Sequence, residues 1–231
     1  AYDFYMGDWS SDVCSSDLEA SLERERILRE AGRRPDSLLL AAAALQRQGY
    51  VNHAIRVARR AHDAGAAPNA ALYRLLYPVA HGAALRAEAE RNKLDPWLAA
   101  ALIRQESLFD PRAISAAGAR GLMQLMPDVG RRIAQAHSIS AWDVELLYEP
   151  EVSLELGTDH LAELMTRYPT LIEGLAAYNA GASRVERWRT KIGAADPEVL
   201  VERIPYVETR DYVRIITRNV QMYRQLYGGE R

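Results

Sequence analysis

The stretch DPWLAAALIRQESLFDP, residues 95–111, indicates that the protein is helical. Asp95 is of a residue type that commonly caps the start of a helix, and Pro96 is favoured at the first helical position. The next proline, Pro111, disfavours helical geometry at the residue before it. These signals together predict a helix over 97–108.

Glu106 is the unusual residue of this predicted helix. It follows Leu98 by eight positions and Leu102 by four, which places its carboxyl group on the same face as both leucines. That face is apolar and is expected to pack inward, so desolvation should raise the pKa of the carboxyl group. The negative end of the helix dipole acts in the same direction. Both effects predict an acid that is neutral at roughly pH 6–7 and can protonate a leaving-group oxygen.

A structural ion pair is the alternative interpretation of Glu106. Its partner would be Arg104, Arg112 or Arg120. Arg104 is only two positions away, so it points to a different side of the helix. Asp110, the nearest acid in the sequence, precedes a proline and is interpreted as part of a turn.

Helical patterns continue through the rest of the chain from Glu19 onward. Apolar spacing, glycine ends and capping residues predict further helices at 38–48 with Asp36 as cap, 51–64, 70–76 with Asn69 as cap, within 123–136 with a start at Pro127, 153–168, 170–180 with Thr170 as cap, and 209–226. Convincing strand alternation is absent, so the predicted fold class is all-α.

The composition excludes several classes of protein and site. The 231 residues carry a net charge of −2, without the basic excess of a general nucleic-acid-binding protein. No apolar run approaches the ~20 residues of a membrane-spanning helix. A single cysteine excludes an internal disulfide and a thiolate metal cluster, and the histidines show no metal-ligand spacing. We therefore expect no metal and no cofactor.

Residues 1–18 differ from the helical sequence that follows them. Ser10–Leu18 is mostly small and polar and has no helical or strand period. It resembles translated read-through of a sequencing adapter, in which case Cys14 is not native; a natural unstructured linker is the alternative. The chain does not begin with Met and shows no signal peptide, which favours a mature form or a fragment.

Three blocks of sequence follow one another in a specific order. They are RQESLFDP (104–111) with SAAGARGLMQLMP (115–127), AAYNAG (176–181), and IPYVETRDYV (204–213). Together they resemble the catalytic core of soluble lytic murein transglycosylases, relatives of goose-type lysozyme. The resemblance implies a lysozyme-like catalytic domain over 84–231, and the helices of 19–83 look like the end of the α-superhelical domain that precedes it in large members.

The resemblance implies that Glu106 is the only catalytic acid and base. It would protonate the oxygen of the β-1,4 bond between N-acetylmuramic acid and N-acetylglucosamine. The resulting carboxylate would then take the proton of the muramoyl C6 hydroxyl as that oxygen attacks the anomeric carbon. The product would carry a 1,6-anhydro ring, so the enzyme would be a lyase. Most glycosidases use a second carboxylate, which this family lacks, and the substrate's N-acetyl group would assist instead.

The same resemblance assigns further residues to substrate binding: Ser107, Ser115, Gln124, Met126, Tyr178, Asn179 and Glu208. Ser107 and Ser115 are candidate hydrogen-bond partners near the site. Gln124 would contact a sugar amide or hydroxyl, and Met126 would offer an apolar wall.

The later blocks carry the remaining assignments. Tyr178 would lie beside the acid, where its hydroxyl could donate to Glu106 or to the substrate. Asn179 would mainly fix the local turn, and Glu208 would bind substrate or order the site at the far edge of the cleft. Core packing with a satisfied hydroxyl is the alternative for Tyr178 and Tyr206.

The implied partner is the glycan strand of peptidoglycan, and the implied location is the periplasm. A muramidase-type hydrolase on the same fold is one alternative, and it would need an ordered water and usually a carboxylate to activate it. A non-catalytic peptidoglycan-binding protein is another, although such a module needs no acid on an apolar face. Protein partners, and cleavage at chain ends or within strands, are left open by the sequence.

Overall fold

The structure is a computed structural model that describes residues 25–229, apart from 28, 30, 140 and 193–196. The segment predicted to be unstructured or non-native, 1–18, lies outside the described residues. The chain divides into two compact units. The first comprises the residues up to Ala80 with the segment Ile114–Gly118, and the second comprises His81–Ala113 and the residues from Ala119 onward.

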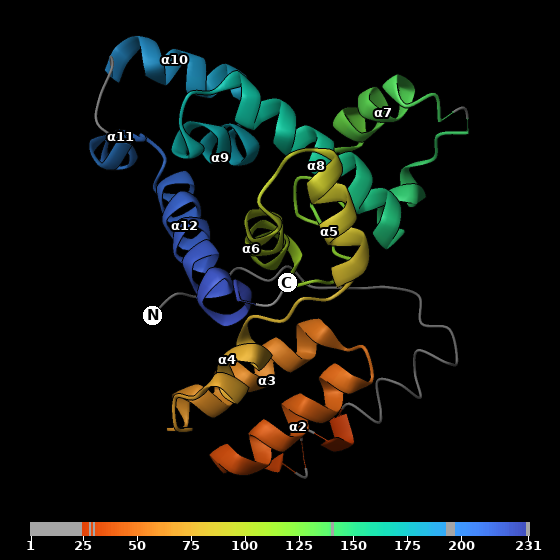
Figure 1. Cartoon of the computed structure of the whole chain (residues 1–231), viewed down its shortest axis with the longest axis vertical. Coiled ribbons are helices and arrows are strands. Elements are labelled where there is room, and N and C mark those ends of the chain that lie inside the picture. The colour runs from red at the N-terminus through yellow and green to blue at the C-terminus, as the bar shows by residue number, and fades with distance from the viewer. Residues whose placement is uncertain (1–24, 28, 30, 140, 193–196, 230–231) are drawn as a thin grey trace. The chain divides into compact units, whose positions relative to one another are not determined.

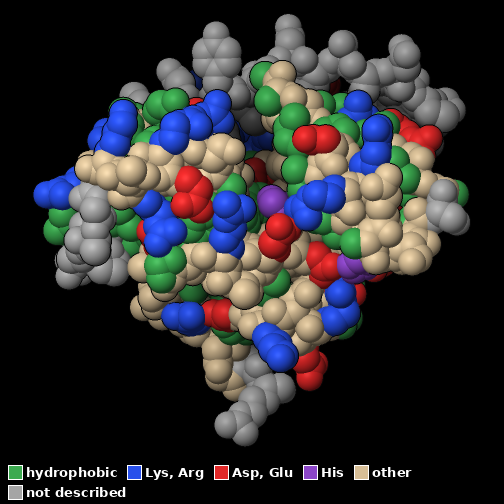
Figure 2. All heavy atoms as spheres, turned by 90° about the horizontal axis from the view of Figure 1, so that it is seen from above, with side chains coloured by type: hydrophobic (Ala, Val, Ile, Leu, Met, Phe, Trp, Pro, Cys, Tyr) green, Lys and Arg blue, Asp and Glu red, His purple; other side chains and the backbone are tan. Residues whose placement is uncertain are grey.

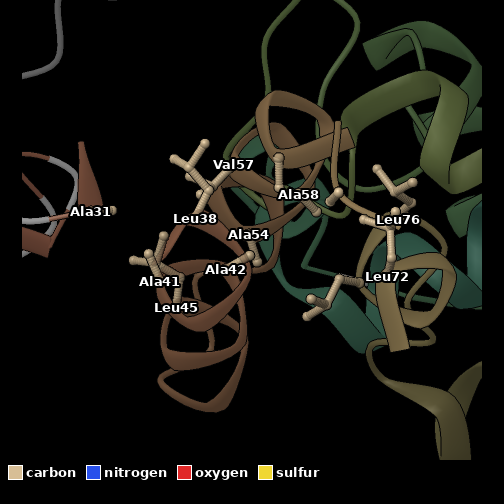
Figure 3. Packing of buried hydrophobic residues seen from close by; sticks show 13 residues of the cluster. Ala31, Leu38, Ala41, Ala42, Leu45, Ala54, Val57, Ala58, Leu72 and Leu76 are labelled. Carbon is tan, nitrogen blue, oxygen red and sulfur yellow. The ribbon is translucent and has the colours of Figure 1, made fainter. Parts of the chain in front are cut away.

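Short antiparallel helices form the first unit: α2 (Pro35–Arg47), α3 (Val51–Asp63) and α4 (Ala70–Leu76). Leu38 and Leu45 of α2 pack with Ala54 and Ala58 of α3, and Leu72 of α4 joins the same buried cluster (Figure 3). The small alanine side chains let the helices approach closely, while the leucines fill the space between them.

The predicted caps of these helices have different outcomes. Asn69 is confirmed, because its side chain accepts a hydrogen bond from the backbone N–H of Leu72 at 3.0 Å. Asp36 is wrong as a cap, because α2 already begins at Pro35 and Arg34 occupies the cap position. Proline suits the first helical position, and Asp36 instead lies in the first turn, where a carboxylate favours the helix dipole.

The second unit contains the remaining elements: α5 (Gly82–Arg91), α6 (Pro96–Ser107), α7 (Pro127–Ala136), the 3-10 helix η1 (Val144–Tyr148), α8 (Pro150–Arg167), α9 (Leu171–Ala180), α10 (Ala182–Ile192), α11 (Pro197–Arg203) and α12 (Val207–Tyr227). The described part of the chain contains no strand beyond one isolated bridge between Arg120 and Leu125. The predicted all-α fold is therefore confirmed.

Helix α6 is the central element of the second unit and packs against α5 and α12 (Figure 1). All residues from Leu98 to Arg104 are buried. The side chain of Asp95 accepts from the backbone N–H of Trp97 at 2.9 Å, so the predicted cap is confirmed. The helix ends at Ser107, within one residue of the predicted end, and its last turn carries Glu106.

Candidate active site

The carboxyl group of Glu106 lies at the end of α6 against α12. Its Oε1 accepts a hydrogen bond from the Tyr212 hydroxyl, and the two oxygens are 2.5 Å apart. Burial raises the pKa of the Glu106 carboxyl group to about 7, and the hydrogen bond from Tyr212 acts in the opposite direction. The group can therefore hold a proton near neutral pH, and Tyr212 can stabilise its negative charge after the proton leaves.

The ion-pair interpretation of Glu106 is wrong. Within the part of the chain that the structure describes, Glu106 forms no salt bridge with Arg104, Arg112 or Arg120. Arg120 instead donates to Glu145 at 3.1 Å. None of these three arginines therefore holds the Glu106 carboxyl group in its ionised form.

Tyr212 is a site residue that the sequence analysis did not single out. The helical spacing of Tyr212, Val213 and Ile216 predicts a buried apolar face, and all three side chains are indeed buried. Burial and the nearby charge of Glu106 raise the pKa of Tyr212 well above its ordinary value, so its hydroxyl stays a donor. The sequence does contain one signal that could have indicated Tyr212 as a site residue. A buried tyrosine hydroxyl needs a hydrogen-bond partner, and a tyrosine on the buried face of this helix therefore predicts one.

Tyr178, near the end of α9, lies close enough to Glu106 for the two groups to interact electrostatically. Burial, and then the charge of Glu106, raise the pKa of Tyr178 well above its ordinary value. The Tyr178 hydroxyl donates to the backbone oxygen of Met123 at 2.7 Å rather than to Glu106. Tyr178 therefore fastens the loop that follows α6 next to the acid.

Unusual backbone geometry surrounds the acid. Leu108, Phe109 and Gln124 are non-glycine residues in the left-handed region, with φ of 52°, 62° and 48°. Gly121 also has a positive φ, 76°, and a Cβ there would lie 1.8 Å from the backbone oxygen of Leu147. Such conformations cost roughly 1–3 kcal/mol for each non-glycine residue and cluster at functional sites.

The side chain of Gln124 is held by this loop. Its Nε2 donates to the backbone oxygens of Ala113 and Gly121, both at 2.9 Å. Since both partners are acceptors, they fix which end of the amide is the nitrogen. The amide oxygen forms no hydrogen bond within the described residues, so it can accept one from a ligand.

The structure gives the other predicted residues of this region different surroundings. The buried hydroxyl of Ser107 donates to the backbone oxygen of Leu122 at 2.8 Å, so it ties the loop to α6. Met126 precedes α7 and is 40% exposed. Ser115 belongs to the segment Ile114–Gly118, which groups with the first unit, so the structure does not join it to the acid.

The beginning of α12 carries the last predicted residues. Asn179 accepts a hydrogen bond from the Thr209 hydroxyl at 2.7 Å, which ties the end of α9 to α12. Glu208 is exposed in the first turn of α12. Tyr206 is 48% exposed and meets the edge of the Trp188 ring, with centroids 5.3 Å apart, so core packing does not describe it.

Comparison with known proteins identifies the family. The sequence model of the transglycosylase SLT domain matches residues 83–201, more than half of the chain. The chain belongs to this family. The resemblance inferred from the three sequence blocks is thereby confirmed, and α6, which carries Glu106, lies within the matched residues.

Curated relatives of this SLT domain protein are similarly named. A putative soluble lytic murein transglycosylase from Haemophilus influenzae is 36% identical over 158 residues, which are 68% of this chain and 27% of the relative. The soluble lytic murein transglycosylase of Escherichia coli K12 is 32% identical over 157 residues, 67% of this chain and 24% of the relative. The chain thus spans about a quarter of the length of these relatives.

Solved structures show the same architecture as this SLT domain protein. An inactive glutamate-to-glutamine mutant of lytic transglycosylase Slt from Pseudomonas aeruginosa superposes with a TM-score of 0.77 and 29% identity, covering 92% of this chain and 34% of that chain. The 70 kDa soluble lytic transglycosylase Slt70 of E. coli has a TM-score of 0.77 at 24% identity, covering 91% and 34%. Because the identity to Slt70 is low, this second likeness is evidence of a shared fold alone.

The surroundings of the SLT domain site show no built metal centre. Within the described residues, no His, Cys, Asp and Glu side chains gather in a group that could bind a metal ion. None of the described helices combines the length and the apolar character that crossing a membrane requires. On the face shown in Figure 2, basic and acidic side chains are interspersed rather than segregated.

Proposed function

We propose that this SLT domain cleaves the β-1,4 bond between N-acetylmuramic acid and N-acetylglucosamine in peptidoglycan and forms a 1,6-anhydro ring. The observation that carries the proposal is Glu106, a carboxyl group whose pKa burial raises to about 7 and which contacts the Tyr212 hydroxyl. The relatives' names support this substrate class. The P. aeruginosa relative supports a glutamate as the essential acid, because its glutamine mutant is described as inactive.

The first step needs Glu106 in its neutral form. Its proton moves to the glycosidic oxygen as the bond between that oxygen and the muramoyl anomeric carbon breaks. A pKa of about 7 keeps a large fraction of the acid protonated near neutral pH, whereas an ordinary glutamate would be almost fully ionised. General acid catalysis of this kind contributes about 10²–10⁴-fold to a rate.

The second step needs the same group as a base. The muramoyl C6 hydroxyl attacks the anomeric carbon and gives its proton to the Glu106 carboxylate, which restores the neutral acid. The Tyr212 hydroxyl donates to Oε1 throughout and stabilises the carboxylate between the two steps. No water is consumed, so the reaction is an intramolecular transglycosylation rather than a hydrolysis.

Some of the remaining predicted residues would bind the sugar chain, and others would order the site. The free amide oxygen of Gln124 would accept from a sugar hydroxyl or amide, and Met126 would supply an apolar surface. Glu208 would act at the end of the site formed by α12, where Asn179 would order the backbone through Thr209. Ser107 would hold the loop against α6, and the assignment of Ser115 to substrate binding stays a prediction. We place this activity in the periplasm, where the implied peptidoglycan substrate lies.

The muramidase-type hydrolase is the less favoured alternative. A hydrolase would need a base to activate water on the opposite face of the sugar. Among the described residues, the hydrogen-bond partner of the Glu106 carboxyl group is the Tyr212 hydroxyl and not a second carboxyl group. The names of the relatives, which are lytic transglycosylases, favour the transglycosylase reaction over the hydrolase.

Mass spectrometry of the sugar products tests the proposal. Purified peptidoglycan is incubated with the protein and, in parallel, with Glu106→Gln. We expect muropeptides one water lighter than hydrolytic products, and at least ~10²-fold fewer of them with the mutant. Full-mass reducing ends would establish the hydrolase instead. Full activity of the folded mutant would remove Glu106 from the mechanism.

A further inference from the structure

A histidine from α8 packs against Tyr178. The ring centroids of His160 and Tyr178 are 5.2 Å apart and the planes are tilted by 43°, within the range of favourable ring contacts. The His160 side chain is 16% exposed, and its buried Nδ1 has no hydrogen-bond partner among the residues that the structure describes. Neither the sequence blocks nor the proposed mechanism assigns a role to this histidine.

Burial favours the neutral form of the His160 ring. Glu163 Oε2 lies 3.8 Å from Nδ1, which is too far for a hydrogen bond, and it pairs with Arg132 at 2.7 Å. Burial lowers the pKa of the His160 imidazole, and Arg132 acts in the same direction while Glu163 opposes it. The contact with Tyr178 is therefore packing between two neutral rings.

Stability alone does not explain a histidine at this position. A polar atom that is buried without a partner costs free energy, so an apolar ring of similar size would suit the fold better. The imidazole ring provides a surface against Tyr178, whose ring also packs against a buried cluster that includes Leu125 and Leu156. His160 thus contributes to how Tyr178 is held rather than to the core.

Tyr178 needs to be held accurately, because its hydroxyl has two neighbours. It donates to the backbone oxygen of Met123 at 2.7 Å, and it lies close enough to Glu106 for that charge to raise its pKa. Met123 precedes Gln124, whose φ of 48° is strained. A rotation of the Tyr178 ring would therefore release the loop and change the surroundings of the acid together.

We propose that His160 is a positioning residue for the transglycosylase reaction, acting through Tyr178. Its ring fixes the Tyr178 ring so that the hydroxyl stays on Met123 and beside Glu106. This inference rests on the proposed function. It requires the shape of an aromatic ring at position 160 and does not require a titratable or hydrogen-bonding group there.

The first test compares two substitutions of His160. We expect His160→Ala to lower kcat/KM by about tenfold, since small misplacements near an active site cost up to ~10²-fold. His160→Phe keeps a ring against Tyr178, so it should retain activity within about twofold and have an equal or higher melting temperature. An active alanine variant, or a phenylalanine variant as impaired as the alanine one, would overturn the proposal.

The second test asks whether His160 acts through Tyr178. In a double-mutant cycle, Tyr178→Phe removes the hydroxyl that His160 is inferred to position. The loss caused by His160→Ala should then shrink to less than about twofold in the Tyr178→Phe background. An undiminished tenfold loss there would show that His160 acts by another route and would refute the positioning role.

Two controls separate this inference from other failures. His137→Ala removes the ion pairs of His137 with Glu155 and Asp159, so it should lower the melting temperature and leave kcat/KM unchanged. Glu106→Gln tests the chemistry itself. An inactive Glu106→Gln together with a fully active His160→Ala would refute only the role of His160, whereas an active Glu106→Gln would refute the proposed function.

Discussion

Replacing Glu106 by glutamine should make the fold more stable at high pH. The folded state raises the pKa of this carboxyl group from 4.5 to about 7, so it holds the proton more tightly than the unfolded chain does. The native state therefore loses stability as the pH rises from about 4.5 to 7. The full loss is about 3 kcal/mol, an upper value because the side chain is partly exposed. Glutamine does not ionise and avoids this loss.

The assay is denaturant unfolding of wild type and Glu106→Gln at pH 5 and at pH 8. Tryptophan fluorescence suits it, because Trp97, Trp142 and Trp188 all lie in the unit that contains the acid. The stability of the mutant relative to wild type should increase by roughly 2–3 kcal/mol between the two pH values. The comparison across pH cancels any constant effect of the amide, such as a changed hydrogen bond to Tyr212.

Glu208→Gln is the matched control, since it makes the same chemical change at an exposed carboxyl group in the same unit. Its stability relative to wild type should stay constant within about 0.5 kcal/mol from pH 5 to pH 8. If Glu106→Gln behaved like this control, the carboxyl group of Glu106 would have an ordinary pKa. The acid would then be ionised at neutral pH, and the first step of the proposed mechanism would fail.

Three further substitutions test the surroundings of the acid. Tyr212→Phe removes the hydrogen bond that lowers the pKa of Glu106, so the alkaline fall in kcat/KM should move to higher pH, and an unchanged pH profile would contradict this. Gly121→Ala places a Cβ against the backbone oxygen of Leu147 and should lower the free energy of unfolding by at least ~2 kcal/mol. Ser107→Ala should cost about 1–2 kcal/mol of stability with little change in KM, because its hydroxyl bonds to backbone oxygens; a large rise in KM would indicate substrate contact.

Local signals predicted the fold well where one residue decides a boundary. Asp95 before Pro96 begins α6, and Asn69 and Thr170 cap their helices as expected, with Thr170 accepting from Glu173 at 3.2 Å. The failure at Asp36 came from two start signals in adjacent residues, of which the proline determined the boundary. Where a helix begins depends on the backbone preferences of a few neighbouring residues, and these can be read from the sequence.

The site is a different case, because its parts come from distant segments. The face shared by Leu98, Leu102 and Glu106 predicts an acid with a raised pKa, and this is confirmed. The partner of that acid was hidden, because Tyr212 lies 106 positions away and its spacing resembles an ordinary core stripe. The hydrogen bond forms because α12 packs on α6 and brings the Tyr212 hydroxyl to the Glu106 carboxyl group.

The end of α6 must meet two opposite demands on one carboxyl group. Burial alone would favour the neutral acid so strongly that the carboxylate formed by the first proton transfer would be a poor intermediate. The hydroxyl of Tyr212 offsets part of that burial and leaves the pKa at about 7, where both forms are accessible. Tyr178 serves a separate purpose, because its hydroxyl is committed to Met123 and stabilises the loop rather than the charge. The two tyrosines should therefore fail differently: loss of the Tyr212 hydroxyl moves the pH profile, whereas loss of the Tyr178 hydroxyl lowers the rate at every pH.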